Sequence, residues 1–347
     1  MRVLELAACA GLAVALPAHG QQYLMVADSS SATRGVHLLD PASGTMVQAN
    51  FIPGTGTSYQ FSTPKHAMQV GQEIWVSDQV QDAVFRFDLQ GNYIATISGG
   101  MDNIRGMGLV NGVVYVANDG SGNGAPPDSL VRFDTSGNAL GPLSVASATS
   151  SPFDVLEYQG DILVSSSSAN DDIHRYTLAG VSVGTFHNST SVNFAQQLAY
   201  ASNGDILVAG FSSPAGIIRL DSTSGAVITS YAGSGPRGVF QMANGNILWT
   251  NGSGAHVLDP STGLSTQVAS GGFQYLDLLT IGGPTGCYAN CDESTTSPIL
   301  NVADFSCFLS EFAAGHSYAN CDQSTTPPVL NVADFSCFLS KFAAGCP

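Results

Sequence analysis

Positive charge is scarce in this chain. Its 347 residues include only 10 Lys and Arg against 26 Asp and Glu, which gives a formal net charge of −16. Such a surface repels nucleic acid and anionic lipid, so neither is an expected partner. Charged residues of both signs make up only 10% of the chain, whereas Gly is abundant, with 39 residues. This composition favours short strands joined by many turns.

Long hydrophobic runs are missing beyond the N-terminus. The apolar run from Leu6 to about Pro17 follows Arg2 and ends before the small residues Ala18 and Gly20. This is the pattern of a secretory signal peptide over residues 1–20. The run is too short to span a membrane, and no other segment is long enough. The sequence therefore predicts a secreted or cell-surface protein with no membrane span.

Cysteine is absent between Cys9 and Cys287, and the six remaining cysteines lie between Cys287 and Cys346. An even, clustered set in an exported protein indicates disulfides. The cysteine spacings lack the paired C-x₂-C units of zinc sites. The sequence also lacks a G-x-S-x-G elbow, an H-E-x-x-H motif and a phosphate-binding loop. No catalytic residue is predicted.

Residues 21–281 repeat a pattern of four short strands with a period of roughly 40–48 residues. Complete units begin near Pro64, Ile104, Pro152, Phe194 and Pro236. Four strands per unit predict the blades of a β-propeller. Residues 22–55 hold three strands without an innermost one, and a lone apolar strand spans about 272–280. We expect this last strand to complete the first blade and close a ring of six.

This pattern resembles the six-bladed NHL/TolB-like propeller superfamily over about three-quarters of the chain. In propellers of the gluconolactonase type, the inner-strand ends hold a central metal. Here the predicted inner-strand starts carry a different set: His66, Arg105, Asp154, Gln196 and Arg237. Two arginines near one axis disfavour a cation. These residues either bind an anionic or sugar-like ligand in the channel or plug it with hydrogen bonds, and we favour the plug.

The C-terminal residues contain a duplication. After a linker at residues 282–286, residues 288–315 match residues 318–345 at 24 of 28 positions. Each copy begins with an oxygen-rich loop and continues into an amphipathic helix. In the first copy Asn301 is the expected N-cap, with Asp304 completing a capping box. The expected apolar helix faces are Phe305, Phe308, Leu309 and Phe312, and Phe335, Phe338, Leu339 and Phe342.

Residues 287–347 resemble a type I dockerin, and in their cysteines the "GC-type" dockerin-like modules of exported planctomycete proteins. The resemblance implies two Ca²⁺ sites in EF-hand-like loops. The implied ligands are Asn290, Asp292, Ser294, Asn301 and Asp304, and Asn320, Asp322, Ser324, Asn331 and Asp334. The departure from the dockerin pattern is an insertion of three residues around Thr295–Ile299. The alternative is that disulfides alone stabilise the module, with the Asn and Asp residues serving as turn and cap formers.

Six cysteines allow 15 pairings. The duplication makes one pairing the leading one, with each loop joined to its own helix and the two ends of the module joined to each other. The expected bonds are Cys291–Cys307, Cys321–Cys337 and Cys287–Cys346.

The sequence thus predicts a mainly β protein with a small helical, disulfide-rich tail. The function we expect is binding or scaffolding without catalysis. The propeller would be displayed through its tail on a cohesin-like or surface-anchoring protein, and the ligand of the propeller is unknown. The candidates for this contact, with plain solvated helix faces as the alternative, are Ser306, Ser310, Glu311, Ser336, Ser340 and Lys341. The alternative is an extracellular propeller enzyme, either a lactonase-type hydrolase or a polysaccharide-degrading enzyme.

Overall fold

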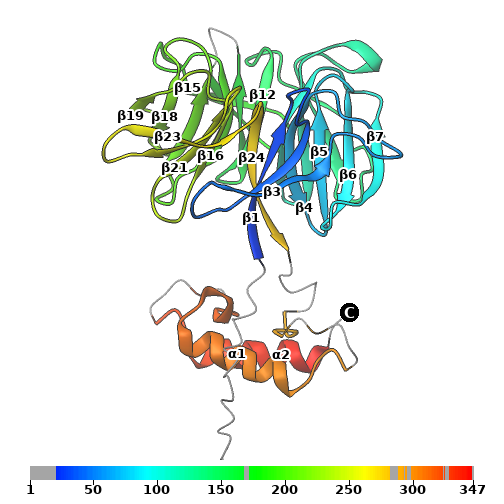
Figure 1. The fold of residues 1–347 in the computed structure, drawn as a ribbon, viewed down its shortest axis with the longest axis vertical. Helices are drawn as coiled ribbons and strands as arrows, with labels where there is room; N and C mark the ends of the chain where they lie inside the picture. Colours follow the sequence, from blue (N-terminus) through cyan, green and yellow to red (C-terminus); the bar gives the residue numbers. More distant parts are fainter. Residues whose placement is uncertain are drawn as a thin grey trace, which may run out of the picture. The chain divides into compact units, whose positions relative to one another are not determined.

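The computed structural model describes residues 21–167, 172–281, 288–292, 294, 298–322, 324 and 328–345. The chain divides into two compact units, one spanning Gln22–Leu279 and one that includes the residues from Thr280 onward. The first unit is built from six four-stranded sheets, which confirms the mainly β, six-bladed propeller (Figure 1). None of the helices among the described residues is long and apolar enough to cross a membrane.

Five blades are consecutive in sequence, and in each the strands follow one another from the innermost outward. The second blade has β4 (Pro64–Val70), β5 (Glu73–Asp78), β6 (Ala83–Asp88) and β7 (Tyr93–Ser98). The third has β8 (Ile104–Val110), β9 (Val113–Asn118), β10 (Ser129–Asp134) and β11 (Leu143–Ser144), with the 3₁₀ turn η1 (Gly122–Gly124) between β9 and β10. The fourth has β12 (Pro152–Tyr158), β13 (Asp161–Ser166), β14 (Ile173–Tyr176) and β15 (Ser182–His187). The fifth has β16 (Ala195–Tyr200), β17 (Ile206–Gly210), β18 (Gly216–Leu220) and β19 (Val227–Ala232). The sixth has β20 (Gly238–Gln241), β21 (Ile247–Asn251), β22 (Gly254–Asp259) and β23 (Leu264–Ser270).

The first blade joins the two ends of the propeller. Its order is β24-β1-β2-β3, with β24 at Phe273–Ile281, β1 at Gln21–Asp28, β2 at Gly35–Leu39 and β3 at Met46–Pro53. Figure 1 shows β24 beside β1. The Ser29 amide donates to the Gly272 carbonyl (3.1 Å), and the Gly272 amide donates to Oδ1 of Asp28 (3.0 Å). The C-terminal strand therefore completes the blade that the N-terminal strands begin.

Tight turns join the strands within each blade. Between β8 and β9, Asn111 and Gly112 have φ values of 50° and 76°. Two consecutive residues of positive φ define the type I′ turn, which matches the twist of a two-residue hairpin. Asn and Gly are the residues that adopt this conformation with the least strain.

The hydrophobic core lies between neighbouring blades. One cluster combines Met68, Trp75 and Val84 of the second blade with Met107 and Phe133 of the third, all of them buried. Each sheet thus buries apolar side chains against the next sheet.

The tail contains two helices, α1 (Val302–Ala314) and α2 (Val332–Ala344), and a 3₁₀ turn, η2 (Ser317–Ala319). The predicted capping boxes are confirmed. Asn301 accepts from the Ala303 amide while Asp304 accepts from the Asn301 amide, and the second copy repeats the arrangement. Gly315 ends α1 in the left-handed conformation, with φ of 76°.

The two copies of the tail pack as an internally symmetric pair. The rings of Phe308 and Phe338 stack with centroids 4.2 Å apart, and those of Tyr288 and Tyr318 stack at 4.9 Å. The two tyrosine hydroxyls donate reciprocally, each to the backbone carbonyl of the other residue, at 2.5 Å. Because equivalent residues meet each other, each copy supplies half of one small core.

Candidate functional site

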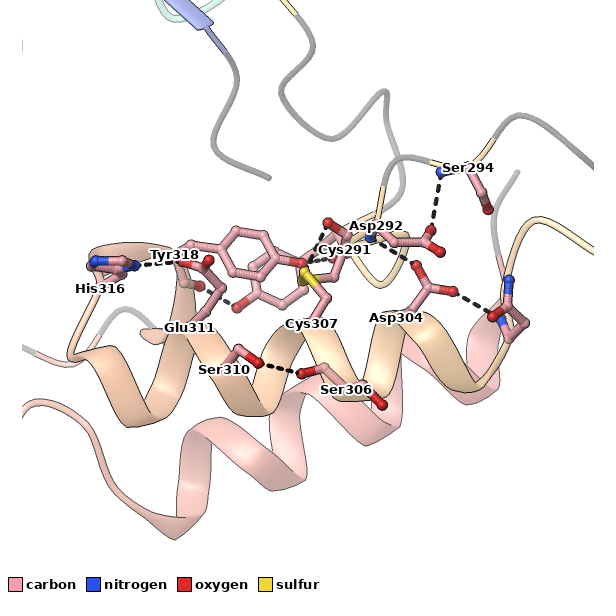
Figure 2. Close-up of a disulfide and its surroundings, with 12 residues drawn as sticks. Cys291, Asp292, Ser294, Asp304, Ser306, Cys307, Ser310, Glu311, His316 and Tyr318 are labelled. Carbon is pink, nitrogen blue, oxygen red and sulfur yellow. Dashed lines mark hydrogen bonds and ion pairs between the residues drawn. A yellow bond between two sulfur atoms is a disulfide. The ribbon is translucent and has the colours of Figure 1, made fainter. Parts of the chain in front are cut away.

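Two carboxyl groups meet in the first loop of the tail. The Asp292 amide donates to Oδ1 of Asp304 (3.1 Å), and Oδ1 of Asp292 accepts from the Ser294 amide (3.0 Å). Figure 2 shows Asp292 and Asp304 close together at the start of α1. Burial and then the neighbouring carboxyl of Asp292 raise the pKa of Asp304. Asp292 and Asp304 thus lie close together even though the three inserted residues increase their separation in sequence.

The second loop repeats these hydrogen bonds, but there burial is outweighed by the Asn331 and Asp322 amides, which lower the pKa of Asp334. The Asp322 amide donates to Oδ1 of Asp334 (3.3 Å), and Oδ1 of Asp322 accepts from the Ser324 amide (2.9 Å).

One Asn oxygen in each loop lacks a hydrogen-bond partner. Oδ1 of Asn290 and Oδ1 of Asn320 are buried and have no hydrogen-bond partner among the described residues. A buried polar atom without a partner is costly, so such atoms point to an absent ligand, ion or water.

The remaining predicted ligands have other uses. Oδ1 of Asn301 accepts from the Ala303 amide at 2.7 Å, and Oδ1 of Asn331 accepts from the Ala333 amide at 2.8 Å. These oxygens therefore cap the helices. The hydroxyl of Ser294 donates to the Ile299 carbonyl, and that of Ser324 donates to the Val329 carbonyl, which leaves lone pairs on both oxygens. Each loop thus offers two carboxyl groups, one orphaned amide oxygen and one hydroxyl.

This donor set fits a hard divalent cation. Ca²⁺ takes six to eight oxygen ligands, including carboxylates, amide carbonyls and waters. Within the described part of the chain, no three His, Cys, Asp or Glu side chains cluster as a metal site. Each loop supplies only two carboxylates, so Ca²⁺ would take its other ligands from Asn290, Ser294, the backbone and water, with the same pattern in the second copy.

Two of the three expected disulfides are present. Cys291 is bonded to Cys307 and Cys321 to Cys337, each across a sequence separation of 16. Each bond joins a loop to its own helix. The expected Cys287–Cys346 bond lies outside the described residues.

The helix faces differ from the sequence expectation at two kinds of position. Leu309 and Leu339 are 44% and 42% exposed, whereas the half-cystines Cys307 and Cys337 pack against the tail core in their place.

Glu311 is 2% exposed and pairs with His316, whose Nδ1 lies 2.9 Å from Oε2 of Glu311 (Figure 2). The prediction that Glu311 is an exposed contact residue is therefore wrong. Ser306, Ser310, Ser336 and Ser340 are exposed.

The buried amino group of Lys65 crosses the propeller channel. Nζ of Lys65 in the second blade donates to Oε1 of Gln196 in the fifth (3.0 Å) and to Oε1 of Gln274 in the first (2.9 Å). It also lies 4.9 Å from the ring centroid of Tyr275. Burial and then the charges of Arg237 and Arg105 hold the pKa of Lys65 well below its usual range. Lys65 therefore closes the channel between opposite blades.

The five predicted channel residues all come from innermost strands or the residue preceding one. Arg105 donates to Oδ2 of Asp119 (2.7 Å) and lies 3.7 Å from the ring centroid of Phe153. Arg237 lies 5.9 Å from the ring centroid of Phe211. Gln196 accepts from Lys65. These contacts fit the plug that we favoured for this part of the channel.

Further along the channel, polar side chains join one blade to the next. Nδ1 of His66 accepts from the Met107 amide (3.0 Å), and Oδ2 of Asp154 accepts from the Leu198 amide (2.9 Å). Oε1 of Gln197 accepts from the amides of Val239 and Leu276, both at 3.0 Å. Burial raises the pKa of Asp154 well above its usual range. Each bond satisfies a backbone amide that the edge of an innermost strand would otherwise leave unpaired.

Lys65, Gln197 and Asp277 were not predicted from the sequence. The innermost strands β4, β8, β12 and β16 each carry an irregularity in register near their start, the first of them between Pro64 and His66. A bulge breaks the alternation of side chains, so consecutive residues such as Lys65 and His66 both reach the channel. Strict alternation assigns only one residue per blade to this position.

Asp277 titrates in the physiological range, because burial raises its pKa to about 7. Between its ordinary value of 3.8 and about 7, the folded chain holds a proton that the unfolded chain has released. Folding then binds a proton, so the contribution of this carboxyl to the free energy of unfolding falls as pH rises through that window. We expect Asp277→Asn to gain stability relative to the unaltered chain on going from about pH 4 to about pH 8.

The measurement is the difference in Tm of the propeller between Asp277→Asn and the unaltered chain across that pH range. The Asp161→Asn variant makes the same charge change at a residue paired with Arg175, away from this channel. A difference for Asp277→Asn that stays constant with pH, or that follows the Asp161→Asn control, would contradict the expectation.

Comparison with known proteins supports the fold alone. No protein-family model matches the chain, and no curated protein matches it either. Among solved structures, one match is a protein of unknown function from Bacteroides caccae, with 15% identity and a TM-score of 0.54 over 74% of this chain and 98% of the other. A chain in the crystal structure of a nidogen/laminin complex matches with 11% identity and a TM-score of 0.60 over 74% of this chain and 98% of the other. The WD40 β-propeller domain of Doa1 matches with 14% identity and a TM-score of 0.50 over 82% and 98%.

Proposed function

We propose that this chain is a secreted or cell-surface binding protein whose NHL/TolB-like propeller is displayed by a dockerin-like tail. The observation that carries the proposal is the repeated loop geometry of the tail. In both copies one loop contains an Asp pair and a buried Asn oxygen that has no hydrogen-bond partner among the described residues. The recurrence of this donor set in two equivalent loops favours a bound cation over a turn with only structural hydrogen bonds.

The docking surface consists of the exposed faces of α1 and α2. Val302 and Leu309 of α1 are 79% and 44% exposed, and their equivalents Val332 and Leu339 are 78% and 42% exposed. Exposed serines accompany them on both helices. Apolar side chains surrounded by hydroxyls are typical of a protein–protein contact. The partner is a cohesin-like or surface-anchoring protein, and calcium holds the loops from which the helices start.

We expect the full-length protein to bind two Ca²⁺ ions, with a rise in the Tm of the tail, because an ion that binds only the folded state stabilises it. The matched variant is Asp292→Asn with Asp322→Asn. It keeps an oxygen for each serine amide and removes one charge from each loop, so calcium affinity should fall by about tenfold or more. Isothermal titration calorimetry and helical circular dichroism measure the two effects. If calcium produced neither heat nor a change in Tm, the proposed ion sites would be ruled out.

The docking role is tested with the unaltered chain and the Asp292→Asn, Asp322→Asn variant. Immobilised full-length chain should retain a partner from the envelope fraction of the host in calcium and release it in EDTA. The Asp292→Asn, Asp322→Asn variant should retain less of that partner in calcium. Capture that is equal in calcium, in EDTA and with the variant would count against calcium-dependent docking.

A further inference from the structure

A pocket of about 490 Å³ lies at the channel mouth away from Lys65. Pockets that hold small ligands have volumes of roughly 300–1,000 Å³. The walls are largely apolar and include Met68, Met107 and Phe240, while His66, Asp154 and Asp277 add polar groups. An apolar enclosure with a few polar groups is the usual composition of a ligand site.

The histidine presents a hydrogen-bond donor that has no partner. Nδ1 of His66 accepts from the Met107 amide, so the proton of the neutral ring is on Nε2. Burial lowers the pKa of His66 to about 3, which keeps the ring neutral. The side chain is 4% exposed, and Nε2 has no hydrogen-bond partner among the described residues. A ligand atom that meets Nε2 must therefore be an acceptor.

A carboxyl group lies next to this donor. Oδ2 of Asp277 is 3.8 Å from Nε2 of His66, which is too far for a direct hydrogen bond. Two polar atoms at this separation are readily bridged by one oxygen. A hydroxyl has the required chemistry, because it accepts from Nε2–H and donates to the carboxylate at once.

Other ligand classes fit this pair of groups less well. A metal ion cannot coordinate Nε2 while that nitrogen carries its proton. An anion meets Glu157 and, above its pKa, ionised Asp277 in the lining, which contains no Lys or Arg. An ammonium group offers only donors and would oppose Nε2–H. A wholly apolar ligand would leave both polar groups unpaired.

We propose that this pocket binds a neutral, hydroxyl-bearing small molecule of the mono- or disaccharide class, with one hydroxyl bridging His66 and Asp277. The inference deepens the binding role proposed for the propeller, because it names the class of ligand. It does not depend on the tail, so it remains testable in the Asp292→Asn, Asp322→Asn protein.

The test uses full-length protein labelled with ¹³C at the methionine methyl groups. Met68 and Met107 line the pocket, whereas Met25 and Met242 are buried outside the cluster that contains Met68 and Met107 and are internal controls. The neutral probes are glucose, galactose, mannose, cellobiose and maltose, and the charged probes are glucuronate and glucosamine. At a pH above the pKa of Asp277, we expect a neutral probe to shift the Met68 and Met107 signals. The affinity for the charged analogues should be lower by about tenfold or more.

Asp277→Asn should lower the affinity for the neutral probe by roughly tenfold or more, because a hydrogen bond to a charged group is lost. Asp161→Asn should leave this affinity unchanged. Binding of a neutral probe that shifts only Met68 and Met107 and is weakened by Asp277→Asn supports the proposal. Three results would overturn it: no shift with any neutral probe, as expected if water alone bridges the pair; shifts of the core methionines instead; or tighter binding of glucuronate. If Asp277→Asn does not fold, the methionine shifts of the unaltered protein decide alone.

Discussion

A chain that ends after Gly271 will not fold into a cooperative propeller, whereas a chain that ends after Ile281 will. The first truncation removes β24, the innermost strand of the first blade, and the second keeps it. β24 contributes the fully buried side chains of Phe273, Tyr275 and Leu279. Losing a single large buried side chain typically costs about 2–5 kcal/mol. Three such losses approach or exceed the roughly 5–15 kcal/mol of a whole domain.

Removal of β24 also breaks hydrogen bonds between blades. Without β24, Lys65 loses Gln274, one of its two hydrogen-bond acceptors, and Gln197 loses the Leu276 amide. The edge of β1 that pairs with β24 is then also exposed, which favours aggregation through pairing of strand edges. The effect is therefore not confined to the first blade.

The two truncations are compared by tryptophan fluorescence, since Trp75 and Trp249 are both buried in the propeller and the tail contains no Trp. We expect a single thermal transition for the chain that ends after Ile281. The chain that ends after Gly271 should show none, or should aggregate. A cooperative transition within a few degrees of the longer chain would show that the ring does not need its closing strand.

Much of the propeller follows from the sequence because its signals are local. Apolar strands and glycine-containing turns recur in every unit, and the count of strands at the two ends implies closure through β24. The channel was harder to predict, since it depends on contacts between blades far apart in the chain. The bulges that bring both Lys65 and His66 inward disturb the alternation on which the prediction relied. The pocket beside Asp277 therefore appears only in three dimensions.

In the tail, the helices, their caps and two disulfides follow from the sequence, because capping boxes and a near-identical duplication are strong signals. The exposure of individual helix residues does not follow as directly. Cys307, which the disulfide joins to the loop, packs against the core while Leu309 is exposed, and Glu311 is buried beside His316. Helical periodicity defines a face only to within about one residue, so its edges depend on the packing partner.

Reduction of the two described disulfides will unfold the tail and leave the propeller intact. Each closes a loop with a sequence separation of 16, for which the chain-entropy model gives about 3 kcal/mol. A module of about 60 residues has a total stability of only about 3–9 kcal/mol. Loss of both bonds removes most or all of it. The propeller has no cysteine, because none lies between Cys9 and Cys287.

Two spectroscopic signals separate the units of the chain. Helical circular dichroism reports α1 and α2, whereas tryptophan fluorescence reports the propeller. In EDTA, we expect a thiol reductant, or replacement of the four cysteines by alanine, to abolish the helical transition while the fluorescence transition stays within a few degrees. Saturating calcium should offset this loss and restore the helical transition, because each of the two sites contributes about 4 kcal/mol at a thousandfold excess over Kd. A helical transition that survives reduction in EDTA would mean that packing around Phe308 and Phe338 keeps the tail folded without disulfides.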